Sequence, residues 1–277
     1  MDVEQVLKKA IHALNYKNVE GVATPVYEGS LLHDRLAFVT GGSSGIGFAI
    51  ARRFLAQGCC VVICSSDGCK LDSALSDLRS ERAASLRLDM RDVDVFDGAL
   101  DEAASLFPEK KGVDIVVNSA GVHGAGSFAD VDEASWDHVM DVNLKAMFFM
   151  CQAAARHMKK KEINGNILNI GSASALKPGW TPYEISKRGV EALTLGAADV
   201  LIKDGIVVNC IAPGPVATPM MGMTEDSNLH SPVNPSGRFA TADEIAGLAV
   251  VMAGPLGRLA VGSSLYATGG SGTLSNE

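Results

Sequence analysis

The sequence of 277 residues is poor in aromatic side chains, contains no long apolar run and has fewer basic than acidic residues. Without a run of about 18 apolar residues, no membrane-spanning helix is expected. The 24 Lys and Arg against 32 Asp and Glu give a net charge of −8, which argues against a general nucleic-acid-binding protein, because such proteins need a basic face. Only 2 Trp, 4 Tyr and 9 Phe accompany 29 Gly, a composition that favours helices packed closely on a sheet over an all-β sandwich.

The six cysteines form no recognisable metal-binding or disulfide pattern. Four of them lie between residues 59 and 69, but they include no CxxC pair and no histidine lies nearby to complete a zinc site. The first ten residues mix acidic and basic side chains and lack the apolar core of a secretory signal. We therefore expect reduced, mostly buried thiols, no bound metal and a cytoplasmic protein.

The chain divides near residue 34. In residues 1–34, apolar side chains from Val3 to Leu14 recur at helical spacing and predict an amphipathic helix. In the interpretation that we favour, this N-terminal extension packs on its own domain. Alternatively, it contacts another subunit or covers a site.

From Arg35 onwards, short apolar runs alternate with amphipathic segments. Strands are predicted at 36–40, 60–64, 85–88, 114–118, 166–170, 206–211 and 264–268. Helices are predicted at 48–57, 71–82, 95–107, 136–160, 183–202 and 242–253. This alternation is typical of βαβ units, so residues 35–277 are predicted to form one α/β domain, a doubly wound parallel sheet with helices on both faces.

A glycine-rich turn separates the first predicted strand from its helix. It reads Thr40-Gly41-Gly42-Ser43-Ser44-Gly45-Ile46-Gly47. Ligands of doubly wound sheets bind beyond the carboxyl ends of the strands, where a helix N-terminus offers free N–H groups and a partial positive charge. Although a tight corner alone could use these glycines, the strand–turn–helix context predicts that the pyrophosphate of a dinucleotide binds here.

The end of the second predicted strand bears on which dinucleotide binds. An acidic residue at this corner bonds the ribose of NAD, but Ser65 takes its place here, and Ser66 stands where NADP enzymes often have arginine. Position 65 carries no carboxylate that would repel a 2′-phosphate. However, no arginine follows it to bind such a phosphate, and Asp67 is close in the sequence. NADP is therefore slightly favoured over NAD.

Tyr183 and Lys187, four residues apart, form the second strong signal. On a helix this spacing puts both side chains on one face. A phenol titrates near ~10, and a neighbouring ammonium favours the phenolate and lowers this pKa. The pair can then exchange a proton with an alcohol or a carbonyl near neutral pH. Taken alone, the spacing also fits an ordinary tyrosine and a solvated lysine.

Further polar segments are predicted at the same edge of the sheet. Ser172 follows the strand at 166–170, and Asn143 lies in the long helix at 136–160. The segments 118–121 (NSAG) and 213–218 (PGPVAT) end two other strands. Because the carboxyl ends of parallel strands meet at one edge, all these segments are expected to line one crevice.

In order and approximate spacing, these motifs resemble the classical short-chain dehydrogenase/reductase family over roughly residues 35–270. The resemblance implies a single Rossmann-type domain with about seven strands, assembled as a homotetramer or homodimer. It implies hydride transfer between NADP(H) or NAD(H) and a ketone or secondary alcohol. The substrates implied are similar to those of 3-oxoacyl-thioester reductases or of sugar and polyol dehydrogenases.

The same resemblance implies four catalytic residues. Tyr183 would be the general acid and base, and Lys187 would bind the nicotinamide ribose and lower the Tyr183 pKa. Ser172 would hold the substrate oxygen, and Asn143 would position a water behind Lys187. The complete set argues against two alternatives: a non-redox reaction on the same scaffold, and a cofactor-binding regulator without turnover.

The resemblance also implies a set of cofactor-binding residues. They comprise the pyrophosphate turn, the ribose corner, the acceptor for the adenine amino group at Asp89, the ribose border at 118–121, the catalytic pair and the carboxamide turn at 213–218. These residues are Gly41, Ser43, Ser44, Gly45, Ile46, Gly47, Ser65, Ser66, Asp89, Asn118, Ala120, Gly121, Tyr183, Lys187, Pro213, Gly214, Val216 and Thr218.

The sequence departs from the family pattern at two places. Ser172 precedes Tyr183 by eleven residues instead of thirteen, so the loop at 173–182 is expected to be short and to reshape one pocket wall; Ser174 fits the spacing less well. Thr268 stands before paired glycines where the family often has an acidic residue.

Two nearby features can each be interpreted in two ways. The methionines at 220, 221 and 223 either line the substrate pocket or pack their own loop. His123 either approaches the substrate or is an ordinary surface histidine.

Overall fold

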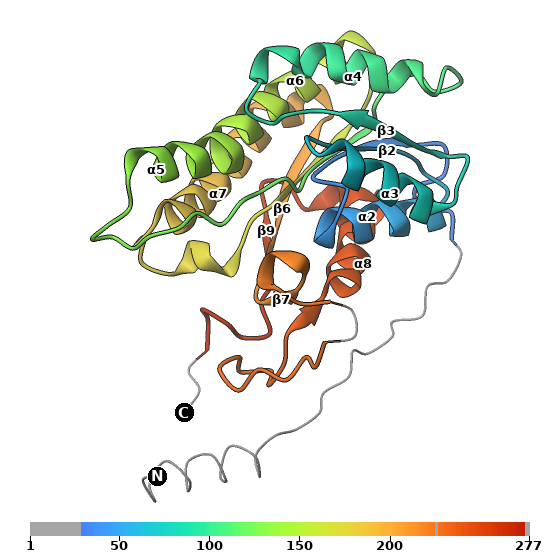
Figure 1. Cartoon of the computed structure of the whole chain (residues 1–277). Coiled ribbons are helices and arrows are strands. Elements are labelled where there is room, and N and C mark those ends of the chain that lie inside the picture. The colour runs from blue at the N-terminus through green and yellow to red at the C-terminus, as the bar shows by residue number, and fades with distance from the viewer. Residues whose placement is uncertain (1–28, 225–226, 275–277) are drawn as a thin grey trace, which may run out of the picture.

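The computed structural model describes residues 29–224 and 227–274. Its centre is a sheet of seven parallel strands in the order β3-β2-β1-β4-β5-β6-β9 (Figure 1). The strands are β1 (Leu36–Thr40), β2 (Cys60–Ser65), β3 (Ala83–Arg87), β4 (Ile115–Asn118), β5 (Asn166–Ile170), β6 (Val207–Pro213) and β9 (Ser264–Ala267). The predicted doubly wound sheet is confirmed. Its order reverses beside β1, where the chain returns to place β4 on the other side of that strand, and such a reversal opens a crevice.

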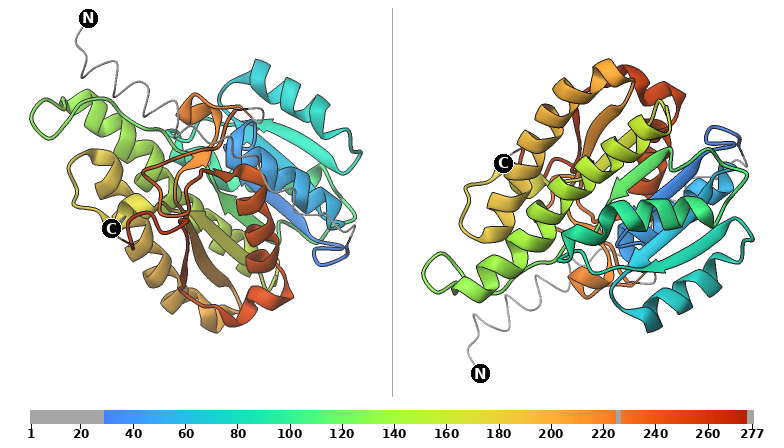
Figure 2. Two further views of the ribbon diagram at one scale, coloured as in Figure 1. Left: turned by 90° about the horizontal axis from the view of Figure 1, so that it is seen from below. Right: turned by 90° about the horizontal axis from the view of Figure 1, so that it is seen from above.

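Helices cover both faces of the sheet (Figure 2). One face is covered by α4 (Phe96–Ser105), α6 (Ala146–Lys160) and α7 (Pro182–Leu201). The other is covered by α2 (Gly45–Ala56), α3 (Gly68–Leu78) and α8 (Ala242–Ala253). Short 3-10 turns occur at η1 (Val93–Val95), η3 (Ala173–Leu176), η4 (Ile202–Asp204), η5 (Pro219–Met221) and η6 (Pro255–Leu259).

Strand β1 is apolar from Leu36 to Val39 because both of its faces are buried. In β1, Leu36 and Phe38 pack into the layer of α4, α6 and α7, whereas Ala37 and Val39 pack into the layer of α2 and α8. Successive side chains of a strand point to opposite faces, so a strand covered on both sides needs a continuous apolar run. This is why β1 could be located from its sequence to the residue.

The helical segment predicted at 136–160 is confirmed, but it is not a regular α-helix throughout. Helix α5 (Glu133–Met140) is followed by a π-helical turn, η2 (Asp141–Lys145), and only then by α6. Asn143 lies in the middle of this turn and is fully buried. A π turn holds one residue more than an α turn, and the spacing of apolar residues did not reveal it.

Two smaller features position the chain around the sheet. β7 (Val216–Ala217) pairs with β8 (Ala240–Thr241) as a separate sheet, which was not predicted because two-residue strands show no alternation. Leu32, within the predicted extension, is 1% exposed and packs in the layer of α2 and α8. The amphipathic helix expected from Val3 to Leu14 lies outside the described residues.

Within residues 29–224 and 227–274, no helix has both the length and the apolar character needed to cross a membrane.

A buried histidine joins α6 to the start of β4. Nε2 of His157 accepts a hydrogen bond from the main-chain N–H of Val113 at 3.0 Å, and its Nδ1 lies 3.1 Å from Oδ1 of Asp101. Because Nε2 must be unprotonated to accept this bond, the imidazole is neutral, with its proton on Nδ1. Burial lowers the pKa of His157, although Asp101 acts in the opposite direction.

This arrangement predicts a loss of stability in acid. Above the ordinary histidine pKa of 6.5, folded and unfolded chains both hold the neutral ring. As the pH falls below that value, the unfolded chain binds a proton that the folded chain resists, so stability falls by up to about 1.4 kcal/mol per pH unit. The free energy of unfolding, measured in urea at several pH values between about 7 and 5, where histidine titrates, gives this slope.

His157→Gln is the matched variant, because a glutamine Oε1 can still accept from Val113 but does not titrate. We expect a shallower slope for this variant than for the wild type. An equal slope in His157→Gln and the wild type would contradict the assignment.

Candidate active site

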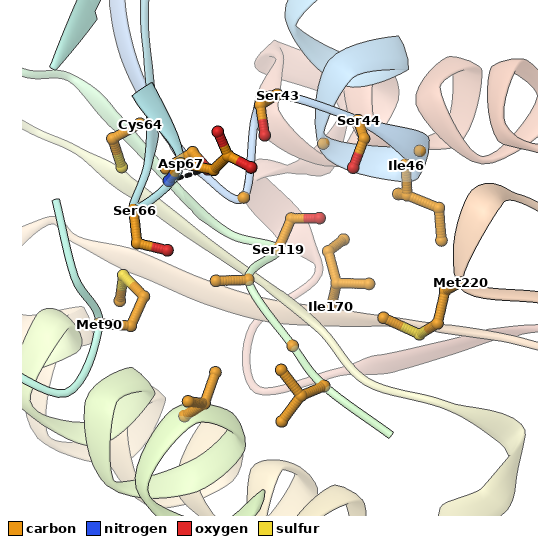
Figure 3. Close-up of a pocket in the computed structure, with 18 of the residues that line it drawn as sticks. Ser43, Ser44, Ile46, Cys64, Ser66, Asp67, Met90, Ser119, Ile170 and Met220 are labelled. Carbon is orange, nitrogen blue, oxygen red and sulfur yellow. Dashed lines mark hydrogen bonds between the residues drawn. The ribbon is translucent and has the colours of Figure 1, made fainter. Parts of the chain in front are cut away.

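A cavity of about 480 Å³ opens at the carboxyl ends of β1, β2, β4 and β5, where the strand order reverses (Figure 3). Most of the residues predicted to bind a cofactor line it: Gly41, Ser43, Ser44, Gly45, Ile46, Gly47, Ser65, Ser66, Asp89, Ala120, Gly121, Tyr183, Lys187 and Thr218. The structure therefore brings together residues that are far apart in the chain.

Four predicted cofactor residues do not line this cavity: Asn118, Pro213, Gly214 and Val216. Asn118 points into the sheet, where its Nδ2 donates to Oδ1 of Asn169 at 2.9 Å and ties β4 to β5. A Cβ on Gly214 would lie 2.4 Å from the carbonyl oxygen of Thr268, so Gly214 lets β6 and β9 approach each other. Asn118 and Gly214 thus take part in the packing beside the cavity, and contact with a cofactor stays a prediction for all four residues.

The glycine turn has the geometry of an anion cradle. Gly41 has φ +64°, and a Cβ on Gly47 would lie 2.4 Å from the carbonyl oxygen of Gly41, so side chains are excluded where the turn closes. Ser44 caps α2 in an extended conformation without a side-chain hydrogen bond, and the first turn of α2 has no acidic residue. The N–H groups and the positive end of this helix therefore face the cavity unopposed and fit a pyrophosphate.

The ribose corner contains a basic side chain that the sequence analysis missed. Ser65 and Ser66 line the cavity at the end of β2. Arg87, which pairs with Ser65 across the β2–β3 ladder, donates from Nε to the carbonyl oxygen of Ser66 at 3.2 Å. Asp67 accepts a hydrogen bond from the main-chain N–H of Lys70 as the cap of α3. The expectation that no arginine is available at this corner is therefore wrong.

Asp89 lines the cavity but already has a partner. Arg91 donates to its carboxylate from Nε at 3.1 Å, from Nη2 at 2.6 Å and from the main chain at 2.9 Å. The hydrogen bonds from Arg91 lower the pKa of Asp89 to about 2, so it remains an ionised acceptor. A carboxylate has about four acceptor positions, which leaves room for an adenine amino group.

Tyr183 is fixed by the start of its helix. Pro182 is the first residue of α7, and the hydroxyl of Thr181 accepts from the main-chain N–H of Tyr183 at 3.2 Å. The carboxylate of Glu184 accepts from the main-chain N–H of Thr181 at 3.0 Å. This capping box ends the short loop at 173–182 and places the tyrosine in the first helical turn.

Ser172 is the serine that acts on Tyr183. Its hydroxyl lowers the pKa of Tyr183, but burial outweighs this effect and, together with Glu184, raises that pKa above its usual value of 10.0. The expected lowering of this pKa by Lys187 stays a prediction. Ser174 is instead bound through its main-chain N–H to Oγ of Ser172 at 3.1 Å.

Lys187 is almost fully buried, 5% exposed. Its Nζ donates to the carbonyl oxygen of Ile170 at 2.9 Å and lies 5.8 Å from the centre of the Tyr183 ring. No ion pair among the described residues includes it. Burial therefore lowers the pKa of Lys187 to about 8.

Asn143 connects two segments of the site. Its Oδ1 accepts from the main-chain N–H of Val122 at 2.8 Å, and its Nδ2 donates to the carbonyl oxygen of Val122 at 2.9 Å and to Oγ of Ser186 at 3.3 Å. The amide thus holds the loop after β4 against α7. A side-chain contact with Lys187 is not seen; both flank Gly121, where a Cβ would lie 3.4 Å from Oδ1 of Asn143 and 3.8 Å from Nζ of Lys187.

Two residues left open by the sequence are placed at this site. The imidazole of His123 stacks on the ring of Tyr183, with the ring centres 4.0 Å apart and the planes 13° from parallel. Met220 lines the cavity, as Figure 3 shows. Sequence reasoning also missed the lining residues Lys70, Arg91, His138 and Val142; only Arg91, two residues after Asp89, stood close enough to a motif to be found.

Comparisons with known proteins agree with this arrangement. A family model described as short chain dehydrogenase matches residues 35–229. A (2S)-[(R)-hydroxy(phenyl)methyl]succinyl-CoA dehydrogenase subunit of Thauera aromatica is 34% identical over 244 residues, which are 86% of this chain and 97% of that protein. A galactitol 2-dehydrogenase (L-tagatose-forming) of Cereibacter sphaeroides is 35% identical over 242 residues, 84% and 93% of the two chains. The crystal structure of a dehydrogenase/reductase from Sinorhizobium meliloti 1021 matches with a TM-score of 0.77 at 34% identity, over 87% of this chain and 97% of that one.

The buried ammonium predicts a variant that is more stable than the wild type. Lys187→Met removes a cation whose pKa falls from 10.5 to about 8, at about 1.4 kcal/mol per pKa unit, and loses one hydrogen bond worth about 1 kcal/mol. We expect a net gain of about 2 kcal/mol below pH 8 that shrinks as the pH rises towards 10.5, above which the wild-type lysine is neutral in both states. Urea unfolding measures it.

Lys70→Met is the control, because Lys70 has an exposed side chain (71%). Its stability should stay within about 0.5 kcal/mol of the wild type. Lower stability of Lys187→Met at every pH would overturn the prediction.

Proposed function

Since this chain belongs to the short-chain dehydrogenase/reductase family, and is therefore an NAD(P)-dependent oxidoreductase that acts on ketones or secondary alcohols, we propose that Tyr183 is its general acid and base. The observation that carries this proposal is the placement of Tyr183 and Lys187, which lie one helical turn apart on α7 and both line the cavity. The hydroxyl of Ser172 acts on the pKa of Tyr183, and two neighbouring hydroxyl groups can act on one substrate oxygen.

The bound nicotinamide supplies or accepts the hydride. In the direction of reduction, negative charge grows on the substrate oxygen, and donors aimed at that oxygen stabilise the transition state. Ser172 and Tyr183 are these donors, and Tyr183 then releases its proton to the oxygen. With its pKa raised by burial, the phenol of Tyr183 is protonated at neutral pH, as a proton donor must be.

We propose that the predicted residues along the cavity hold the dinucleotide. The glycine turn binds the pyrophosphate, Asp89 accepts from the adenine amino group, and Thr218, which lies against Gly45, borders the nicotinamide. Lys187 donates to the ribose hydroxyls. This role is supported by its burial without an ionic partner among the described residues.

We propose a 3-oxoacyl thioester as the first substrate class and a polyol as the second. The (2S)-[(R)-hydroxy(phenyl)methyl]succinyl-CoA dehydrogenase subunit of Thauera aromatica supports the thioester class. The apolar side chain of Met220, which lines the cavity and is 53% exposed, also supports it. The galactitol 2-dehydrogenase supports the second.

We further propose that the enzyme is a cytoplasmic homo-oligomer, with residues 1–34 as an extension of the domain at 35–277. An apolar hollow of about 370 Å³ between α6 and α7 is bordered by Phe148 and Val200, which are 44% and 55% exposed, and a second copy of this surface would cover it. All six cysteines are free, which supports a reducing compartment.

Tyr183→Phe tests the proposed chemistry. The variant keeps the ring and its packing but loses the proton, so we expect turnover to fall by about 10²–10⁴-fold while the dissociation constant for the dinucleotide stays within about twofold. Nicotinamide absorbance is followed with acetoacetyl-CoA and with galactitol, using both cofactors, and cofactor binding is measured by fluorescence titration. Near-normal kcat in the variant would reject the assignment.

Arg87→Gln tests the cofactor preference. We propose that Ser65, Ser66 and Arg87 bind the 2′-phosphate of NADP, because an arginine lies at this corner and no carboxylate occupies position 65. We expect the wild type to prefer NADP and the variant to lose about tenfold in kcat/KM with NADP, with little change for NAD. Arg79→Gln, an exposed arginine after α3, is the control. A wild-type preference for NAD, or an equal loss with both cofactors, would refute this binding site.

A further inference from the structure

The ring of Tyr183 is covered by a residue that none of the family motifs includes. The imidazole of His123 lies nearly parallel to the phenol, 4.0 Å from centre to centre and 13° between the planes. Aromatic rings at this separation attract each other and resist tilting. His123 itself is exposed to solvent, so the stack lies at the mouth of the site.

The chain on both sides of His123 is held in place. Val122 is bound at its N–H and its carbonyl oxygen by the amide of Asn143. Gly124 lies against Val139 of α5, where a Cβ would come within 2.6 Å of Cγ2. The imidazole is therefore carried by a fixed stretch of main chain.

The same network fixes the other partner of the stack. The amide of Asn143 also donates to Oγ of Ser186, and the Ser186 hydroxyl donates to the carbonyl oxygen of Tyr183 at 2.7 Å. One buried amide thus sets the position of the loop that carries the imidazole and of the helix that carries the phenol. What remains free is the rotation of the phenol ring, and the flat contact with His123 restricts it.

The groups around His123 favour a neutral imidazole. Burial lowers its pKa, Glu184 raises it and Lys187 lowers it. A neutral ring acts through its shape and not through its charge.

We propose that His123 is a positioning residue that holds the phenol ring of Tyr183 in the plane from which its hydroxyl reaches Ser172 and the substrate oxygen. The inference rests on the proposed role of Tyr183. It gives the loop after β4 a role in the proton transfer, in addition to its proposed position beside the cofactor.

Three substitutions at His123 test the stack. His123→Phe keeps a flat ring, His123→Leu keeps apolar bulk without one, and His123→Ala removes both. With acetoacetyl-CoA or galactitol, whichever the wild type turns over faster, we expect kcat to fall about tenfold in the leucine and alanine variants and to stay within about twofold in the phenylalanine variant. The KM for the dinucleotide should not change. Phe128→Ala, at an 82% exposed aromatic of the same loop, is the matched control.

A second measurement follows Tyr183 directly. The ultraviolet absorbance of its phenolate, taken as the difference from the same protein carrying Tyr183→Phe, is titrated with pH. Removing the covering ring exposes the phenol to water, so His123→Ala should lower the Tyr183 pKa towards its ordinary value of 10.0, whereas His123→Phe should leave it unchanged. Thermal denaturation shows whether each variant is folded.

The outcomes separate this inference from the proposed function. Wild-type kcat and titration in His123→Ala would overturn the inference, and so would an equal loss of kcat in the alanine and phenylalanine variants. In both cases an inactive Tyr183→Phe would leave the role of Tyr183 standing. An active Tyr183→Phe would instead reject the proposed function itself.

Discussion

The hydrogen bond from the ammonium of Lys187 to the carbonyl oxygen of Ile170 is the contact on which the site depends. A desolvated cation without an ionic partner is costly, and here it is held by a main-chain oxygen at the end of β5. The N–H of Gly171 bonds to β6 on one side of β5, and the oxygen of Ile170 is available on the other side because β4 ends at Asn118, opposite Asn169. The position of the ammonium is therefore set by the sheet.

Around this cation, main-chain groups supply most of the contacts. Thr40, at the end of β1, accepts hydrogen bonds from the N–H groups of Ser119 and Ala120, both at 3.1 Å, and so fastens the loop after β4 to the glycine turn. Asn143 fastens the next residues of that loop to α7. The cavity is thus lined by backbone held through a few buried side chains, which suits an anionic ligand in a protein of net charge −8.

The sheet and the pair formed by Tyr183 and Lys187 could be predicted because each leaves a local pattern in the sequence. Leu36–Val39 of β1 is a continuous apolar run, and Tyr183 and Lys187 lie one helical turn apart. What was missed depends on register or on packing between distant segments. Arg87 reaches Ser66 only because it faces Ser65 in the β2–β3 ladder, and Asn118 turns away from the ligand because Asn169 lies beside it on β5. The pKa of Tyr183 depends on burial, which a sequence does not show and which raises it, and on Glu184, which raises it as well.

The π turn at Asp141–Lys145 has a consequence for how this protein can change over evolutionary time. It contains one residue more than a regular helix needs, and that surplus turns the amide of Asn143 towards Val122 and Ser186. A deletion of one residue here would leave a regular α-helix, but the turn that presents the Asn143 amide to Val122 and Ser186 would be lost. No single substitution has that effect. At this position the length of the chain, and not only its composition, is under constraint, so alignment gaps in relatives should avoid these five residues.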